Sequence, residues 1–539
     1  MSKSGSVPRT LADRRSPAGP GLRSPSPLRE LFAPLEQLLT CGGDARLAID
    51  PGTGRNAYGC GPIPCPDIPA FSSCTASTIS QRGYEAAESA RTALMASALL
   101  HGLVECFDAR IEAMRGELKT LLGLERSAAE VVFSASGTDA QLQALALTRA
   151  LLGDDLTTVI VAADQTGSGT VNTARGNHFG DRSTNDCKVS RGAPVSGLGP
   201  LSSVAVRLRD GNDRLRSPSA IDAEVLETVE SLVAQGARVM LEVMDCSKFG
   251  YQAPSDRCTD EIAARWPGRV QIVVDACQMR LGRSRIARYL ARGDLVLLTG
   301  SKYFAGPPFS GALLVPPQLG QAIGAMTELA PGIADYSSRS DWPMRWRGLR
   351  AQFSAAPNFG QWLRWEAALE EIRAYDAVPD AFRRAALRQL GDGIVKIIAG
   401  APALRLLPPQ PRPGHDDEFA DPSIFAFTVE PGGHPLSLAQ CRAIYSALRD
   451  DRPGDAPAGA PAAPCLIGQP VGWGGRDDDA VAAMRICISA RHVIDAWAAH
   501  PDLAHGALTR ILDDAATAVA NIQALLPQPD AIAKDFHAD

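Results

Sequence analysis

The chain has 539 residues, enough for two or three domains, and its 45% hydrophobic and 21% charged residues are typical of a soluble globular protein. The net charge of −6 without a long basic stripe argues against nucleic-acid binding, and the longest apolar stretches are too short and interrupted to cross a membrane. The twelve cysteines form no CxxC pair, so no metal or redox motif is expected, and the lack of a secretory signal favours a cytoplasmic protein.

The N-terminal part of the chain divides into a tail and an arm. Residues 1–29 are basic and proline-rich, which predicts a disordered tail. Residues 30–80 are interpreted as an arm, because 46–77 are unusually rich in Gly, Pro and polar residues before the first long helix. Two further Pro-rich stretches, 408–422 and 449–464, predict flexible loops.

Strand-like and helix-like segments alternate from about residue 80 to residue 316, and 81–345 are predicted to form a large domain. Several strand candidates are continuous Val/Ile/Leu runs, as expected for strands covered on both faces. Helical patterns at 139–152, 222–235 and 284–293 separate them. The predicted strands are 130–136, 157–164, 203–210, 238–245, 269–278, 294–300 and 311–316. The alternation predicts an α/β fold with a mainly parallel, doubly wound sheet.

The C-terminal third is predicted to form a smaller domain. Residues 346–400 read as a helical connection, and 401–539 as a small α/β domain with strand-like segments at 423–431 and 484–491.

Polar signals follow four of the predicted strands. They are Ser136-Gly137-Thr138, Asp164, Asp275 and the run from Thr299 to Lys302. In parallel sheets, ligands bind at the carboxyl ends of the strands, so these residues are predicted to converge on one site.

Two of these strand ends carry the residues on which the chemistry depends. Lys302 follows the buried run "DLVLLTGS", and burial lowers a lysine's pKa, as Schiff-base chemistry requires. Asp275 ends "QIVVD", where a carboxylate is costly unless it meets a cation such as a protonated pyridine nitrogen. Gln278 is placed to donate to a neighbouring oxygen. The alternatives are a solvent-reaching lysine and, for Ser136 or Thr138, a simple helix cap.

The Ser-Gly-Thr turn at a helix start, Asp-Ala-Cys-Gln at one strand end and Gly-Ser-Lys at the next together resemble the fold type I pyridoxal-phosphate enzymes. The likeness is to the class V aminotransferase and cysteine desulfurase branch, and it covers about residues 80 to 320. The resemblance implies pyridoxal 5'-phosphate as cofactor, with Lys302 as the Schiff-base lysine.

The resemblance also implies roles for the other matching residues. Ser136, Gly137 and Thr138 match the phosphate-binding turn, and Asp275 the partner of the pyridinium nitrogen. Gln278 matches the group beside the ring hydroxyl, while Thr299 and Ser301 lie where the family adds phosphate or ring contacts.

Substrate contacts are expected from two other regions. Arg485 in "MRICIS" resembles the small-domain arginine that clamps a substrate carboxylate, with an exposed strand-edge arginine as the alternative. Arg55, Asn56 and Tyr58 lie in the arm, which in this superfamily often reaches the partner subunit's active site; a plain structural arm is the alternative.

The chain departs from the family pattern at three points. Ser301 stands where desulfurases have His before the lysine, and Gln165, Thr166 or His178 is the candidate for covering the ring, with His178 favoured as a surface or core residue. Cys465 lies roughly where a desulfurase holds its persulfide cysteine, but its flanks favour a structural cysteine.

These features predict a homodimeric enzyme that acts on an amino acid or related primary amine, with its site near the subunit interface. Amino transfer is the first expectation because Ser301 replaces the desulfurase-like histidine. A lyase or desulfurase is the alternative, and a non-catalytic regulatory protein of the same fold is a third hypothesis.

Overall fold

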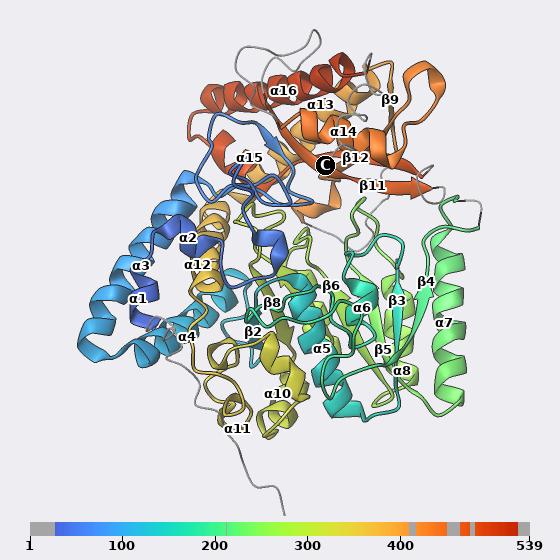
Figure 1. The fold of residues 1–539 in the computed structure, drawn as a ribbon. Helices are drawn as coiled ribbons and strands as arrows, with labels where there is room; N and C mark the ends of the chain where they lie inside the picture. The colour runs from blue at the N-terminus through green and yellow to red at the C-terminus, as the bar shows by residue number, and fades with distance from the viewer. Residues whose placement is uncertain (1–26, 212, 409–416, 450–463, 475–479, 527–539) are drawn as a thin grey trace, which may run out of the picture.

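A seven-stranded sheet forms the centre of the large domain in the computed structural model, which describes residues 27–211, 213–408, 417–449, 464–474 and 480–526 (Figure 1). The strand order is β2-β8-β7-β6-β5-β3-β4, in which β8 runs antiparallel to both neighbours and the other pairs are parallel. The strands are β2 (Glu130–Ser134), β3 (Leu156–Val161), β4 (Ser202–Val206), β5 (Arg238–Met244), β6 (Val270–Asp275), β7 (Leu295–Thr299) and β8 (Gly311–Val315). The mainly parallel sheet predicted from the sequence is therefore confirmed.

Helices separate the strands of this sheet and cover it. Strands β2, β7 and β8 are buried along their whole length, which explains why their sequences are unbroken apolar runs rather than alternating patterns. The helices of this region are α5 (Gly137–Leu152), α6 (Thr170–Thr173), α7 (Pro218–Ala234), α8 (Asp256–Arg265), α9 (Arg283–Arg292), α10 (Pro317–Gly324) and α11 (Arg347–Arg350), with 3₁₀ turns η2 (Pro331–Asp335) and η3 (Arg339–Asp341).

A helical layer flanks the sheet on the side where the N-terminal segment lies (Figure 1). Helix α12 packs against α2, α3 and α4, and both Trp362 and Trp365 on it are 1% exposed. Gly102, with a φ of 89°, separates α3 from α4, since this left-handed backbone ends a helix. The elements are α1 (Pro27–Leu31), α2 (Leu35–Leu39), η1 (Ala45–Leu47), α3 (Gln81–His101), α4 (Leu103–Leu121) and α12 (Phe359–Asp376).

A second, five-stranded sheet forms the small domain, in the order β1-β11-β12-β10-β9. Its first strand comes from the N-terminal arm and pairs parallel with β11, so this part of the arm is built into the small domain. The elements are β1 (Ala70–Phe71), β9 (Leu404–Leu406), β10 (Ile424–Val429), β11 (Leu466–Gly474) and β12 (Val481–Cys487), with α13 (Asp380–Ala399), η4 (Glu418–Ala420), η5 (Pro431–Gly433), α14 (Leu438–Ala447), α15 (Ala490–Ala496) and α16 (Pro501–Ala524).

Some expectations fall outside the described residues. Residues 1–26 of the expected tail are outside the described ranges. Residues 409–416 of the first Pro-rich stretch and 450–463 of the second are outside them as well. Within the described ranges, no helix is long and apolar enough to cross a bilayer, and no group of three His, Cys, Asp or Glu side chains is arranged to hold a metal ion.

Candidate active site

A cavity of about 490 Å³ lies at the carboxyl edge of the seven-stranded sheet, bordered by the N-terminal arm and by β11 and β12 of the small domain. This volume is in the range of small-molecule sites. Three of the four predicted strand-end signals line it, at Ser136–Thr138, at Asp275 and at the run that ends in Lys302. The fourth, Asp164, does not, because its Oδ1 accepts the backbone N–H of Leu208 at 2.8 Å beside the cavity lining. Arg55 and Asn56 are also outside the lining.

Lys302 lies in the turn that follows β7 and projects its ammonium group into the cavity wall. Nζ donates to the carbonyl oxygen of Thr75 at 2.6 Å and to that of Cys74 at 3.4 Å. Burial lowers the pKa of Lys302, although the Cys74 and Cys277 thiols act in the opposite direction. A lysine held in this way loses its proton more readily than an exposed one and becomes a nucleophilic amine.

Asp275 is the last residue of β6, the strand next to β7. Its Oδ1 accepts the backbone N–H of Cys277 at 3.0 Å, and burial raises the pKa of the carboxyl. Among the described residues no cation forms an ion pair with it. A carboxylate in such a setting is stabilised by a bound cation at hydrogen-bond distance.

The first turn of α5 faces the same cavity. The Ser136 hydroxyl caps the helix by accepting the backbone N–H of Asp139 at 3.3 Å and by donating to the Asp139 carboxylate. The expected cap is therefore present, and Gly137 and Thr138 of this first turn, where backbone N–H groups have no acceptor within the helix, line the cavity. A Cβ at Gly137 would stand 2.6 Å from the Cys277 sulfur, so only glycine fits there.

Gln278, Thr299 and Ser301 complete the large-domain wall of the cavity. The amide of Gln278 already bonds within the protein, donating to the carbonyl of Cys74 at 3.1 Å and accepting from Arg280 at 2.7 Å. The Thr299 hydroxyl donates to the carbonyl of Cys277 at 2.8 Å. The Thr299 bond ties the end of β7 to the loop after β6, and the Gln278 bond ties that loop to the arm.

The backbone is strained next to these residues. Met279, Ala305 and Phe309 have φ values of 52°, 56° and 69°, a region that side-chain-bearing residues seldom adopt. They flank Gln278 and Lys302 in sequence, and Phe309 itself lines the cavity. Strain of this kind concentrates at functional sites, where the surrounding structure holds it in place.

Arg485 reaches the cavity from β12 and is 2% exposed. Its guanidinium donates to the carbonyl of Lys248 at 3.1 Å, to the Thr75 hydroxyl at 3.3 Å and to the carbonyl of Gln469. Its Nε has no partner among the described residues. The alternative of an exposed strand-edge arginine does not hold, because the side chain is buried at the cavity.

Of the three arm residues predicted to contact substrate, only Tyr58 lies at the cavity. Tyr58 lines the cavity, whereas Arg55 donates to the carbonyl of Arg449 and lies in the wall of a different hollow of about 1090 Å³ beside α15 and α16. Asn56 closes a turn, because its Oδ1 accepts the N–H groups of Tyr58 at 2.9 Å and Cys60 at 3.1 Å.

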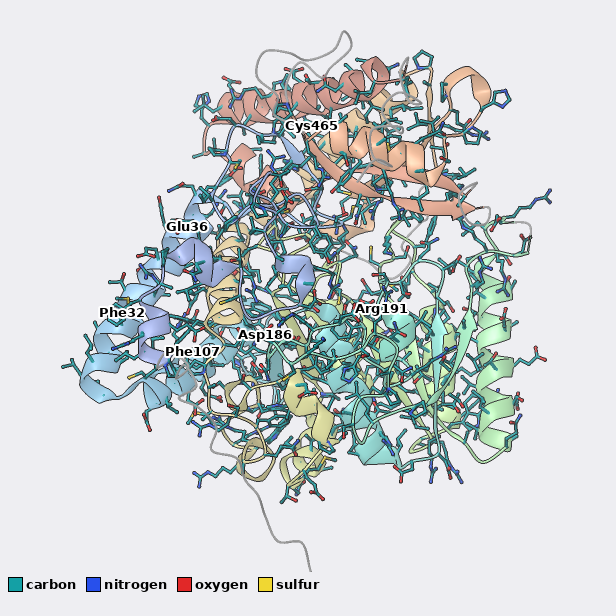
Figure 2. The ribbon with its side chains drawn as sticks, in the orientation of Figure 1. Phe32, Glu36, Phe107, Asp186, Arg191 and Cys465 are labelled. Atoms are coloured by element: carbon teal, nitrogen blue, oxygen red, sulfur yellow. The ribbon has the colours of Figure 1, made fainter. Side chains whose placement is uncertain are left out.

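The remaining candidates are also placed. Gln165 and Thr166 line the cavity, and Gln165 accepts from the Ser247 hydroxyl at 2.6 Å while its Nε2 has no partner among the described residues. His178 bonds to the Tyr336 hydroxyl at 2.6 Å outside the lining and is a core histidine. Cys465 lies in the small domain (Figure 2), where burial raises its pKa to about 12.

The sequence reasoning missed several cavity residues, among them Arg46, Lys248 and Cys74. Arg46 lies in η1, is paired with Asp44 at 2.6 Å and places its guanidinium over the Phe309 ring. A signal existed for Lys248, since it follows the end of β5 in the same way that Lys302 follows the end of β7. No local pattern singled out Arg46 or Cys74.

Comparison with known proteins supports the fold. No family model and no curated protein matches the sequence. Among solved structures, a NifS-like protein aligns with a TM-score of 0.50 at 12% identity, covering 83% of this chain and 98% of its own. At this identity the likeness shows the fold alone, and the predicted fold type I architecture is confirmed.

Two further solved structures align over similar lengths. One is a mutant of C-DES with glycine covalently linked to its PLP cofactor, at a TM-score of 0.48 and 15% identity, with 83% of this chain and 97% of that chain covered. The other is the cysteine desulfurase CsdA from Escherichia coli, at a TM-score of 0.44 and 14% identity, with 82% and 94% covered.

Proposed function

We propose that this chain is a pyridoxal-phosphate-dependent enzyme acting on an amino acid or related primary amine. The observation that carries the proposal is the pairing of two half-buried groups at adjacent strand ends of one cavity: Lys302, whose pKa is lowered, and Asp275, which forms no ion pair with any described residue. The fold, which is shared with a NifS-like protein, agrees with it.

The residues present fit this cofactor. A protonated pyridine nitrogen is the cation that Asp275 lacks, and the helix terminus at Gly137 and Thr138 suits a phosphate. The glycine at 137 lets this turn pack directly against the Cys277 sulfur after β6. Lys302 lies on the same wall, so its Nζ is available to a carbonyl carbon between these two anchors.

When bound, the cofactor supplies an electron sink for the electron pair left on the substrate's α-carbon. Asp275 keeps the proton on the pyridine nitrogen, and Lys302 Nζ takes the α-proton and returns it. Arg485 orients the substrate by binding its α-carboxylate through a planar, two-pronged contact. The backbone carbonyl of Thr75 holds the Lys302 ammonium when Nζ carries a proton.

Amino transfer is the reaction that we propose first. Ser301 precedes Lys302 where the resembling desulfurases have His, and Cys465 is a buried small-domain residue. C–S cleavage is the second candidate, favoured by one observation. The Cys74 thiol lines the cavity, and although burial raises its pKa, the hydrogen bond from Cys487 and the charge of Arg485 lower it below the ordinary value.

Product analysis separates these two reactions. Amino transfer should give one keto acid per amino donor consumed, with no sulfide from cysteine. Sulfide release from cysteine that is lost in Cys74→Ser would instead establish C–S cleavage. A homodimer with cytoplasmic location is also part of the proposal, and light scattering on the purified chain tests the dimer.

Covalent labelling tests the central claim. Borohydride treatment of the purified yellow protein should attach the cofactor to the peptide that contains Lys302, as read by mass spectrometry. Lys248→Met is the matched control, because it removes the other lysine of the cavity and should leave the label on Lys302. A label on another peptide, or a colourless protein that binds no added pyridoxal phosphate, would refute the proposal.

A further inference from the structure

Positive charge predominates in the cavity wall. Its basic side chains are Arg46, Lys248, Lys302, Arg442 and Arg485. Within the described residues, Asp275 is its only acidic side chain. Asp44 neutralises Arg46, and Lys302 and Arg485 already have roles in the proposed function. Two cations, Lys248 and Arg442, are left without an assigned anion.

Lys248 is the more confined of these two cations. It follows β5, is half-buried, and forms no ion pair with any described residue, whereas Arg442 is exposed at α14. Burial and the nearby charges of Arg485 and Lys302 lower the pKa of Lys248 to about 8, despite the attraction of Cys74 and Asp275. An ammonium group in this setting is stabilised by an anion that enters the cavity.

Lys248 and Arg485 are neighbours on the cavity wall. The guanidinium of Arg485 donates to the backbone carbonyl of Lys248 at 3.1 Å, so the Arg485 cation lies against the backbone that carries the Lys248 side chain. Phe249, the next residue, also lies near the Arg485 guanidinium, 6.0 Å from its ring centroid. A small ligand with two anionic groups would therefore find two separate cations within one wall of the cavity.

We propose that Lys248 binds a second acidic group of the substrate, so that the enzyme selects amino acids with an acidic side chain. This inference rests on the proposed function for the site of the amino group and on Arg485 for the α-carboxylate. Lys248 is a specificity-determining residue in this scheme, since it contacts the side chain of the substrate and not the bonds that react.

Calorimetric titration of the purified holoprotein tests the inference without turnover. Succinate carries two carboxylates and butyrate one, on chains of equal length. Succinate should bind with a Kd lower by roughly tenfold or more, the order expected for one additional charge-assisted contact. Equal binding of succinate and butyrate by the wild-type holoprotein would overturn the inference.

Variants identify the residue responsible. Lys248→Met and Lys248→Gln should bring the succinate-to-butyrate ratio to about one, and Lys248→Arg should restore most of the preference, because it restores the charge. Arg442→Met is the matched control at the other unassigned cation and should leave the ratio within about threefold. Loss of the preference in Arg442→Met but not in Lys248→Met or Lys248→Gln would overturn the assignment.

The pH dependence gives an independent readout. Lys248 carries its charge below its pKa of about 8, so succinate affinity should be constant from the pH at which both carboxylates are ionised up to near pH 8, and should fall as the pH rises through it. The charged and titratable groups facing it are Arg485, Lys302, Cys74 and Asp275. The titration of these groups also affects two control measurements, the pH dependence of butyrate affinity and the pH dependence of succinate affinity in Lys248→Met. If the parent protein's succinate affinity changes with pH in the same way as both controls, Lys248 has no role.

The two proposals fail in different ways. Cofactor content is read from the absorbance of the same protein samples. A protein that binds no pyridoxal phosphate refutes the proposed function, whatever its affinity for succinate. A holoprotein that binds the cofactor and labels at Lys302, but shows no preference for succinate, refutes the role of Lys248 alone.

Discussion

The two walls of the cavity are built in different ways. The large-domain wall consists of residues that directly follow strands, such as Asp275 after β6 and Lys302 after β7, so the sheet itself sets their spacing. The opposite wall combines the arm with β11 and β12, which are far apart in the sequence. The first wall holds the residues proposed for the chemistry together with Lys248, and the second holds Arg485, the residue proposed for the α-carboxylate.

Thr75 is the point where the two walls meet. Its carbonyl oxygen accepts from Lys302 Nζ at 2.6 Å, while its hydroxyl accepts from Arg485 at 3.3 Å and from the backbone N–H of Gln469 at 3.0 Å. The lysine of one wall and the arginine of the other are therefore bonded to a single arm residue. Substitutions of Lys302 and Asp275 on the large-domain wall should remove most of the activity, and those of Arg485 on the opposite wall should weaken substrate recognition.

The largest effect is expected for Lys302→Ala. Removing the amine removes the proposed base, and kcat should fall by roughly a thousandfold or more. Cofactor should still bind but should not be trapped by borohydride. Lys119→Ala is the matched control and should keep parental activity, because Lys119 lies on α4 and donates to the backbone carbonyl of Ser127, away from the cavity lining. Substantial turnover by Lys302→Ala would remove the lysine from the mechanism.

Asp275→Ala should have the next largest effect. The variant should fold, as judged by circular dichroism, because the hydrogen bonds that are lost involve only Cys277. Activity should fall by roughly a hundredfold or more, in line with about 3 kcal/mol for removing one member of a buried charge pair. Asp275→Asn keeps the shape and should behave similarly, so near-normal kcat in either variant contradicts the role of the charge.

Arg485→Lys tests whether Arg485, on the opposite wall, binds the α-carboxylate of the substrate. Lysine keeps the charge but lacks the planar fork, so kcat/KM for α-carboxylate substrates should fall by roughly ten- to a hundredfold. The cofactor absorbance should stay that of the parent, since Arg485 lies on the substrate-binding wall. Unchanged kinetics, or a preferred substrate without a carboxylate, would show that the carboxylate is bound elsewhere.

Gly137→Ala should have a smaller effect, on the cofactor rather than on substrate. The new Cβ would stand 2.6 Å from the Cys277 sulfur, and relief of this overlap should cost about 1–3 kcal/mol. Equilibrium titration should show weaker pyridoxal-phosphate binding, and thermal unfolding a lower Tm. The double variant Gly137→Ala/Cys277→Ala tests the cause, because removal of the sulfur should restore both values.

Arg55→Ala should have the smallest effect. Its guanidinium bonds to the carbonyl of Arg449 outside the cavity, so kcat/KM should stay within about threefold of the parent value. Tyr58→Phe provides the comparison, since Tyr58 lines the cavity. A large loss in Arg55→Ala, measured together with an unchanged Tm, would indicate that Arg55 serves the cavity of a partner subunit.

Much of the large-domain wall could be predicted from the sequence because strand ends are local features. An apolar run ends at a polar residue, and parallel strands bring such ends to one edge, which placed Asp275, Lys302 and the Ser136–Thr138 turn together. The same reasoning applied to β5 would have found Lys248. The departure at Ser301 was visible in the sequence, but its consequence for the reaction was not.

The opposite wall depended on tertiary structure. The sequence contains Arg485, Arg46, Arg55 and Tyr58 with nothing local to distinguish a cavity residue from a surface residue, since each is a polar side chain in a short strand or an irregular arm. Pairing of the two-residue strand β1 with β11 draws the arm into the small domain, and Thr75, just after β1, then meets β12. Such long-range pairing decides which side chains are buried together, because burial depends on the neighbours that folding supplies and not on adjacent residues.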